Sequence, residues 1–121
     1  MATVLIVDDA ETHLYLMSKI VQDQGHEVIT AGGGEQGVQA ALDHHPDLIL
    51  MDVVMPDMNG FQATRKISRN PATAEIPVIF VTSKDQETDK IWGMRQGASA
   101  YLTKPVDKSA LIKAINDALG D

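Results

Sequence analysis

The chain lacks cysteine, and it has few aromatic residues and few positive charges. Without cysteine, disulfide bridges, cysteine-ligated zinc and thiol catalysis are excluded. The 10 Lys and Arg residues stand against 17 Asp and Glu residues, and the resulting net charge of −7 disfavours binding to DNA, RNA or an anionic lipid surface. No apolar run is long enough to span a bilayer, and no signal peptide precedes the first apolar run. We therefore expect a soluble, cytoplasmic protein with no membrane insertion and no nucleic-acid partner.

The residues that are present fit one compact domain. The length of 121 residues is close to the common domain size, so the chain can bury a real core. Hydrophobic residues make up 44% and charged residues 22%, which excludes a disordered or collagen-like chain. Because no linker, charge block or internal repeat divides the sequence, residues 1–121 are expected to form a single domain.

Short apolar runs alternate with segments of helical periodicity along the chain. Five runs predict strands, at residues 3–7, 28–30, 48–51, 78–81 and 100–103. In the last segment, Leu111, Ile115 and Leu119 share one helical face, and similar spacing occurs in the segments between the runs. Strands that are each followed by a helix predict an α/β protein with a parallel sheet.

The composition of the predicted strands also predicts their order. The first, third and fourth runs are apolar without a break, which is typical of parallel strands covered by helices on both faces. The second run alternates with polar residues and the fifth carries hydroxyl groups, so these two are expected at the edges. This arrangement predicts a (βα)5 flavodoxin-like, doubly wound sheet in the order 2-1-3-4-5.

Most residues capable of chemistry lie where the predicted strands end. They are Asp8 and Asp9 after the first run, Asp52 after the third, Thr82 and Ser83 after the fourth, and Lys104 and Pro105 after the fifth. Ligands of open parallel sheets bind beyond the carboxyl ends of the strands, where the strand order reverses. We therefore expect three carboxylates to converge in one crevice, with a hydroxyl group and an ammonium group beside them.

This set of side chains predicts a magnesium-dependent phosphoryl acceptor. Clustered carboxylates repel one another unless a cation lies between them, and Mg²⁺ prefers oxygen ligands. With Asp8 and Asp9 holding Mg²⁺, the Asp52 carboxylate is free to attack phosphorus and form an aspartyl phosphate. Lys104 and Thr82 would bind the phosphoryl oxygens, because phosphoryl transfer depends on positioning and on neutralising charge.

These residues resemble the receiver domain of two-component response regulators, the CheY-like family. The resemblance covers the whole chain. It rests on Asp8-Asp9, Asp52, Thr82 and Lys104-Pro105, on the turn Met55-Pro56-Asp57-Met58-Asn59-Gly60, and on Gly97-Ala98 ahead of Tyr101-Leu102. The segment 84–90, continuing through Trp92, Gly97 and Lys104, is similar in particular to the stand-alone PilH-type regulators of type IV pilus twitching motility.

The resemblance implies a phosphorylation-switched signalling module. Asp52 would be the phosphorylation site and would receive its phosphoryl group from a sensor histidine kinase. The implied magnesium ligands are Asp8, Asp9, Asp52 and the backbone carbonyl of Val54. The catalytic set would be Asp52, Thr82 and Lys104. The protein would not be an enzyme beyond its own phosphorylation and dephosphorylation.

The resemblance also implies how phosphorylation reaches a partner. Tyr101 would change rotamer as Thr82 moves inward, and this switch would remodel the face formed by the fourth helix, fifth strand and fifth helix toward a downstream target protein. The Lys104–Pro105 bond would be cis. Residues 1–121 would form a stand-alone, monomeric receiver domain without an effector domain.

Two further residues are expected at the mouth of the site. Val54 and Lys84 lie two positions after Asp52 and Thr82, where the resemblance places the entry of hydrolytic water. We expect the apolar Val54 to position that water poorly, so that the Asp52 phosphate is longer-lived than with a polar residue at position 54.

Two other classes of function stay open. Gly32, Gly34 and Gly37 spell G-x-G-x-x-G with acidic residues downstream, so a nucleotide-binding α/β domain is the alternative. We favour a flexible turn there, in which the glycines supply positive φ angles. The other class is a receiver-shaped scaffold that is never phosphorylated, and the intact acidic set together with Lys104 argues against it.

Other polar residues and glycines have structural explanations. Asp9 is expected to cap the helix that follows it. The four histidines, at positions 13, 26, 44 and 45, are expected at the surface without metal, because none has a helical i, i+4 histidine partner. Gly93 fits either a packing contact or a helix left marginal so that it can shift on phosphorylation.

Overall fold

Five strands alternate with five helices in the computed structural model, which describes residues 1–120. The strands are β1 (Thr3–Val7), β2 (Glu27–Ala31), β3 (Leu48–Met51), β4 (Val78–Thr82) and β5 (Ala100–Thr103). The helices are α1 (Glu11–Asp23), α2 (Gly34–His44), α3 (Gly60–Arg69), α4 (Glu87–Arg95) and α5 (Lys108–Leu119). All five predicted strands are confirmed, with β2 and β4 slightly longer than the apolar runs. Within residues 1–120, none of the helices has the length and apolar composition that a membrane crossing requires.

The strands form one parallel sheet in the order β2-β1-β3-β4-β5. This order confirms the prediction, with β2 and β5 at the edges. It reverses at β1, which pairs with both β2 and β3. Val7 at the end of β1 lies opposite Met51 at the end of β3. The residues that follow these two strands therefore leave the sheet side by side.

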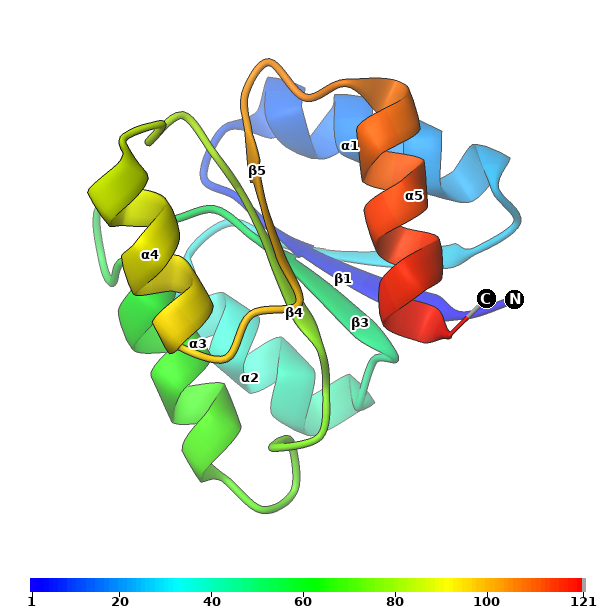
Figure 1. Ribbon diagram of the computed structural model, residues 1–121. Helices are drawn as coiled ribbons and strands as arrows, with labels where there is room; N and C mark the ends of the chain where they lie inside the picture. The colour runs from blue at the N-terminus through cyan, green and yellow to red at the C-terminus, as the bar shows by residue number, and fades with distance from the viewer. Residues whose placement is uncertain (121) are drawn as a thin grey trace.

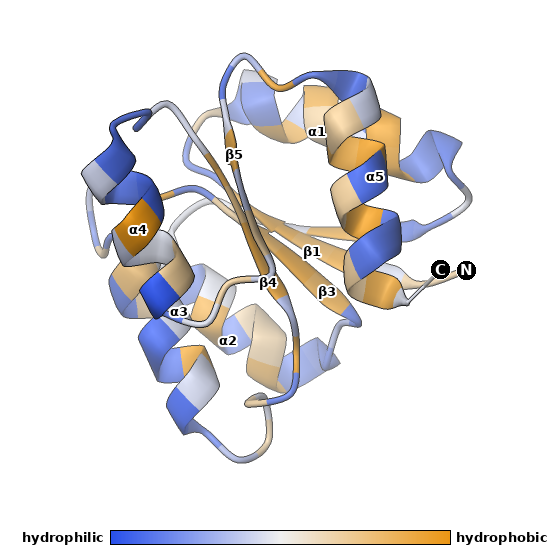
Figure 2. Ribbon diagram, in the orientation of Figure 1, coloured by the Kyte–Doolittle hydropathy of each residue, from blue (hydrophilic) through white to orange (hydrophobic). Residues whose placement is uncertain are grey.

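Helices cover both faces of the sheet (Figure 1), with α1 and α5 on one face and α2, α3 and α4 on the other. Alternate residues of β1 divide between two cores: Val4 and Ile6 pack with α1 and α5, and Leu5 and Val7 pack with α2 and α3. Figure 2 shows β1 and β3 as hydrophobic along their length, in agreement with burial on both faces. This sandwich fixes the strand ends that carry the polar residues.

The start of α1 differs from the expected cap. Ala10 is the N-cap residue, and no side chain caps the helix, so the expectation that Asp9 does so is wrong. Instead, Asp8 Oδ1 accepts a hydrogen bond of 2.9 Å from the Ala10 amide. The Asp9 carboxylate is therefore free to face the site. By contrast, α3 begins with a capping box, in which Asn59 and Gln62 accept hydrogen bonds from each other's backbone amides.

The glycines before and within α2 allow close packing. The expectation that they supply positive φ angles is wrong, because the glycines with positive φ are Gly25, Gly97 and Gly120. A Cβ atom on Gly34 would lie 2.7 Å from the carbonyl oxygen of Met58. A Cβ atom on Gly37 would lie 2.8 Å from Val7 Cγ1. These glycines let α2 approach β1 and the loop after β3.

Candidate functional site

Three carboxylates converge beyond the ends of β1 and β3. Asp8 is 0% exposed and Asp52 is 6% exposed, whereas Asp9 lies at the surface. One carboxylate oxygen from each residue lies within 4.8 Å of the others. The predicted convergence is confirmed. Since hard divalent cations prefer oxygen ligands of this kind, the donor set fits Mg²⁺.

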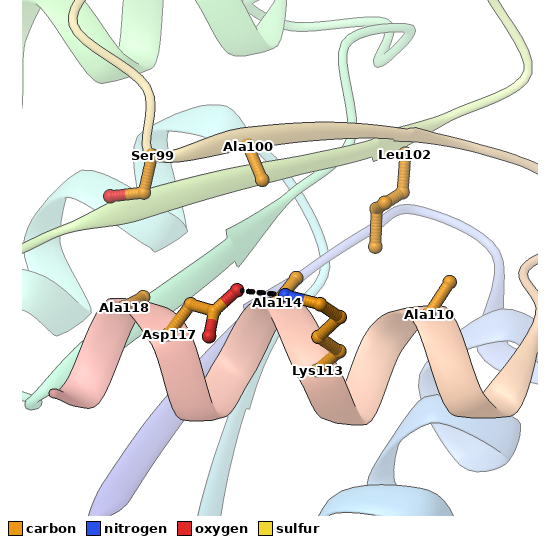
Figure 3. A pocket seen from close by; sticks show the side chains of 8 residues that line it. All are labelled: Ser99, Ala100, Leu102, Ala110, Lys113, Ala114, Asp117 and Ala118. Atoms are coloured by element: carbon orange, nitrogen blue, oxygen red, sulfur yellow. Dashed lines mark hydrogen bonds and ion pairs between the residues drawn. The ribbon is translucent and has the colours of Figure 1, made fainter. Parts of the chain in front are cut away.

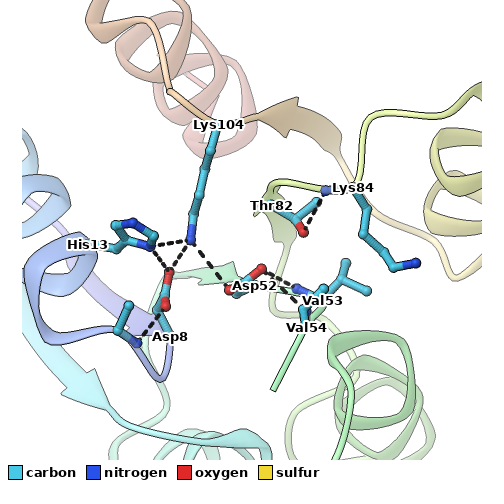
Figure 4. A network of polar contacts seen from close by, with 9 residues as sticks. Asp8, His13, Asp52, Val53, Val54, Thr82, Lys84 and Lys104 are labelled. Carbon is cyan, nitrogen blue, oxygen red and sulfur yellow. Dashed lines mark hydrogen bonds and ion pairs between the residues drawn. The ribbon is translucent and has the colours of Figure 1, made fainter. Parts of the chain in front are cut away.

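Lys104 supplies the positive charge inside this acidic site. Its Nζ atom lies 2.6 Å from Asp8 Oδ2 and 3.4 Å from Asp52 Oδ2 (Figure 4). The side chain is only 14% exposed, so the ammonium and the carboxylates compensate one another's burial. The backbone is held as well, because the Lys104 amide donates to the Thr82 carbonyl at 2.8 Å. The Lys104–Pro105 bond is cis, as the resemblance implies.

The Asp52 carboxylate has a defined orientation. Oδ1 accepts hydrogen bonds from the amides of Val53 at 2.7 Å and Val54 at 3.4 Å. Oδ2 faces Lys104 (Figure 4). The Val54 side chain is 51% exposed, so an apolar group lies beside Asp52 at the surface. One oxygen of Asp52 is therefore bound to the loop after β3, and the other faces the cationic side of the site.

The two predicted switch residues meet at the backbone of Lys84, in the loop after β4. The buried Thr82 hydroxyl accepts a hydrogen bond of 3.3 Å from the Lys84 amide. The Tyr101 hydroxyl donates to the Lys84 carbonyl at 2.8 Å. A Cβ atom on Gly93 would lie 2.6 Å from Tyr101 Cδ2, which favours the packing explanation for Gly93. A displacement of this loop would therefore affect both switch residues.

Tyr101 makes the free energy of unfolding depend on pH in the alkaline range. Burial raises the pKa of this tyrosine to about 12, and the negative charges of Asp89, Asp52 and Asp85 add to the effect. In the unfolded chain the phenol ionises at its ordinary pKa of about 10. The folded protein retains this proton between about pH 10 and pH 12, where the unfolded chain loses it, so the free energy of unfolding decreases as the pH rises through this window.

We expect a near-ultraviolet absorbance titration to detect this tyrosine. The difference between the wild type and Tyr101→Phe isolates its ionisation, and its midpoint should lie at about pH 12. The same pair of proteins, unfolded in denaturant, provides the reference curve near pH 10. A folded-state midpoint equal to the unfolded one would contradict the buried, negatively charged surroundings described for this ring.

His13 is a residue of the site that the sequence interpretation missed. Its Nδ1 atom lies 2.7 Å from Lys104 Nζ and 3.6 Å from Asp8 Oδ2. The expectation of a surface histidine is therefore incomplete for this residue, whose side chain is 45% exposed. The sequence feature that could have placed His13 in the site is its position four residues after Asp9, in the first turn of the helix that follows the acidic pair.

The G-x-G-x-x-G segment does not form a phosphate site in this structure. It follows the edge strand β2, and the amides at the start of α2 already have an anionic partner. Asp57 Oδ1 accepts from the Gly34 amide at 3.1 Å, and Oδ2 accepts from the Glu35 amide at 3.0 Å. These hydrogen bonds lower the pKa of Asp57. Because a pyrophosphate would need the same amides, the geometry disfavours nucleotide binding there.

The sequence identifies the class to which this fold and site belong. Residues 4–116 match the response regulator receiver domain, and the chain belongs to that family. Among curated relatives, the chain is 54% identical over 119 residues to protein PilH of Pseudomonas aeruginosa, and the alignment covers 98% of each protein.

Solved structures agree with this assignment. The chemotaxis protein CheY4 of Vibrio cholerae has a TM-score of 0.91 at 32% identity, with 98% of this chain and 99% of that chain covered. The receiver domain of the sensor histidine kinase PA1611 of Pseudomonas aeruginosa has a TM-score of 0.91 at 26% identity, with 99% and 98% covered. The latter structure contains a magnesium ion coordinated in the active site cleft.

Proposed function

We propose that the chain is a signalling module switched by phosphorylation of Asp52 in a magnesium-dependent reaction. The observation that carries this proposal is the position of Asp52, which shares a 4.8 Å carboxylate cluster with Asp8 and Asp9 and lies 3.4 Å from the Lys104 ammonium. Membership of the receiver family supports the proposal. The magnesium ion in the similar PA1611 receiver structure supports the choice of metal.

The proposed step is attack of an Asp52 carboxylate oxygen on the phosphorus of a phosphohistidine. An O–P bond forms, the P–N bond breaks, and its electron pair leaves with the imidazole nitrogen of the kinase. Asp8, Asp9, Asp52 and the Val54 carbonyl would hold Mg²⁺, which supplies neutralisation of the phosphoryl charge. The Lys104 ammonium and the Thr82 hydroxyl would bind other phosphoryl oxygens.

The phosphorylated form would signal through the face of α4, β5 and α5. The phosphate adds negative charge and strong acceptor oxygens. The Thr82 hydroxyl would donate its O–H to one of these oxygens and move toward it, away from the Lys84 amide from which it now accepts a hydrogen bond, and this movement would disturb the loop that also holds Tyr101. A groove of about 580 Å³ between β5 and α5 offers a surface for a target protein (Figure 3). It is lined by Ser99, Ala100, Leu102, Ala110, Lys113, Ala114, Asp117 and Ala118.

The similarity to PilH supports a place in a motility pathway. We propose a sensor histidine kinase as phosphodonor and a downstream protein as target, in control of type IV pilus or chemotaxis-like motility. The alignment covers 98% of PilH, so the comparison extends over nearly the whole of that protein. The monomeric state and the cytoplasmic location remain predictions.

Intact-mass measurement tests the proposed chemistry. The wild-type protein is incubated with acetyl phosphate, once with Mg²⁺ and once with a chelator that removes it. We expect one phosphate adduct per chain with Mg²⁺ and none with the chelator, since the metal neutralises the phosphoryl oxygens during transfer. No adduct under either condition would favour the scaffold that is never phosphorylated, and an equal adduct under both would contradict the role of the metal.

The lifetime of the phosphate tests the role of Val54. Because the apolar side chain beside Asp52 offers no hydrogen bond to an incoming water, Val54→Asn should shorten the half-life of the phosphorylated form. A single gained hydrogen bond of about 1 kcal/mol corresponds to about fivefold. Loss of the adduct mass with time provides the measurement, and Leu16→Asn on the exposed surface of α1 provides the control. An unchanged or longer half-life in Val54→Asn refutes the hypothesis.

A further inference from the structure

We infer that His13 is a positioning residue for phosphoryl transfer and that its Nδ1 atom holds the Lys104 ammonium at the site when the carboxylates are occupied by metal. The contact that carries this inference joins Lys104 Nζ and His13 Nδ1 at 2.7 Å. The inference rests on the proposed function for the reaction that it serves. The contact itself exists in the unphosphorylated protein and can be tested there.

The chemistry of the two groups fixes the direction of this hydrogen bond. An ammonium has three N–H donors and no acceptor, so the histidine nitrogen that faces it must present a lone pair. Nδ1 is therefore the acceptor, and the proton of the neutral ring lies on Nε2. The tautomer of His13 follows from the contact.

Among residues 1–120, three groups accept from the Lys104 ammonium, and His13 differs from the other two. Asp8 Oδ2 lies 2.6 Å from Nζ, His13 Nδ1 lies 2.7 Å away, and Asp52 Oδ2 lies 3.4 Å away. The two carboxylates are also the oxygen donors expected to hold Mg²⁺. His13 is the acceptor in this set that lies outside the acidic cluster. When the two carboxylates bind Mg²⁺, the hydrogen bond to His13 remains. The other N–H groups of Lys104 are then available to the phosphoryl oxygens.

The position of His13 in the fold suits this role. It lies in the first turn of α1, and Lys104 lies in the loop after β5, 91 residues away along the chain. Figure 4 shows the ring beside Lys104, on the side away from Thr82. The histidine therefore approaches the ammonium from one side and leaves the side toward Asp52 and Thr82 for the incoming group. Without it, the four-carbon side chain of Lys104 would be held only by the charges that the metal neutralises.

Nuclear magnetic resonance of the unphosphorylated full chain tests the contact. We expect His13 to carry its proton on Nε2 and the Lys104 ammonium to show a signal protected from exchange with water. With saturating Mg²⁺ bound to the carboxylates, that ammonium signal should disappear in His13→Leu and persist in His44→Leu, which replaces an exposed histidine on α2. A proton on Nδ1 of His13, or an ammonium signal unchanged in His13→Leu, would overturn the inference whether or not the protein is ever phosphorylated.

The rate of phosphorylation by acetyl phosphate at saturating Mg²⁺ tests the positioning role of His13. We expect His13→Leu to react about tenfold more slowly than the wild type, as for loss of one hydrogen bond to a charged group. His13→Asn should recover most of the rate, because its amide oxygen takes the place of Nδ1, and His44→Leu should react at the wild-type rate. Equal rates for wild type and His13→Leu, or no recovery in His13→Asn, overturn the inference. A wild type that takes up no phosphate contradicts the proposed function instead.

Discussion

Gly60→Ala is expected to lower the free energy of unfolding by roughly 3 kcal/mol or more. A Cβ atom on Gly60 would lie 2.0 Å from the carbonyl oxygen of Asp52 and 3.0 Å from Val53 Cα. Both neighbours are backbone atoms of the buried segment that directly follows β3, so no flexible side chain can move aside. The Gly60 amide also donates to the Val53 carbonyl at 2.9 Å. The methyl group would push the start of α3 away from the residue proposed to carry the phosphate.

Urea denaturation of Gly60→Ala, compared with Gly32→Ala, measures this loss in the free energy of unfolding. Gly32 is the matched control, because the nearest atom to its added Cβ would be Gln36 Oε1 at 3.5 Å, an ordinary contact with a flexible side chain. We expect Gly32→Ala to remain within about 0.5 kcal/mol of the wild type. If Gly60→Ala behaves like Gly32→Ala, the start of α3 moves more easily than its backbone contacts indicate.

The sheet and the centre of the site could be predicted from the sequence because both follow from local patterns. The unbroken apolar runs of β1, β3 and β4 identify strands covered on both faces, and the mixed runs of β2 and β5 identify the edges. Together they match the flavodoxin-like order that the sheet has. Parallel strands bring their carboxyl ends to one edge. Asp8 and Asp52 therefore had to meet, and Lys104 after β5 had to lie near them.

The contacts of His13 and Asp57 could not be predicted in the same way. Each joins segments that are distant in the sequence: His13 reaches Lys104 after β5, and Asp57 caps the start of α2 from the loop after β3. Their geometry depends on the paths of the loops, which hydrophobic periodicity does not describe. The glycines of α2 were misinterpreted for a related reason. Glycine is favoured both where the backbone has a positive φ angle and where two segments approach closely, and the sequence alone does not distinguish these two explanations.

Asp52→Asn is expected to abolish the phosphate adduct formed with acetyl phosphate and Mg²⁺, because a carboxamide lacks the nucleophilic oxygen of a carboxylate. The variant should still fold, since asparagine has nearly the same shape and its substitution removes one of three mutually repelling charges. Asp57→Asn is the matched control. Asp57 lies five residues further along, and its oxygens bind the amides of α2, so its substitution should leave the adduct in place. Intact mass gives the adduct, and a thermal melt shows that both variants are folded. An adduct that persists in Asp52→Asn and disappears in Asp57→Asn would move the acceptor out of the acidic cluster and remove the basis for the roles given to Lys104 and Thr82.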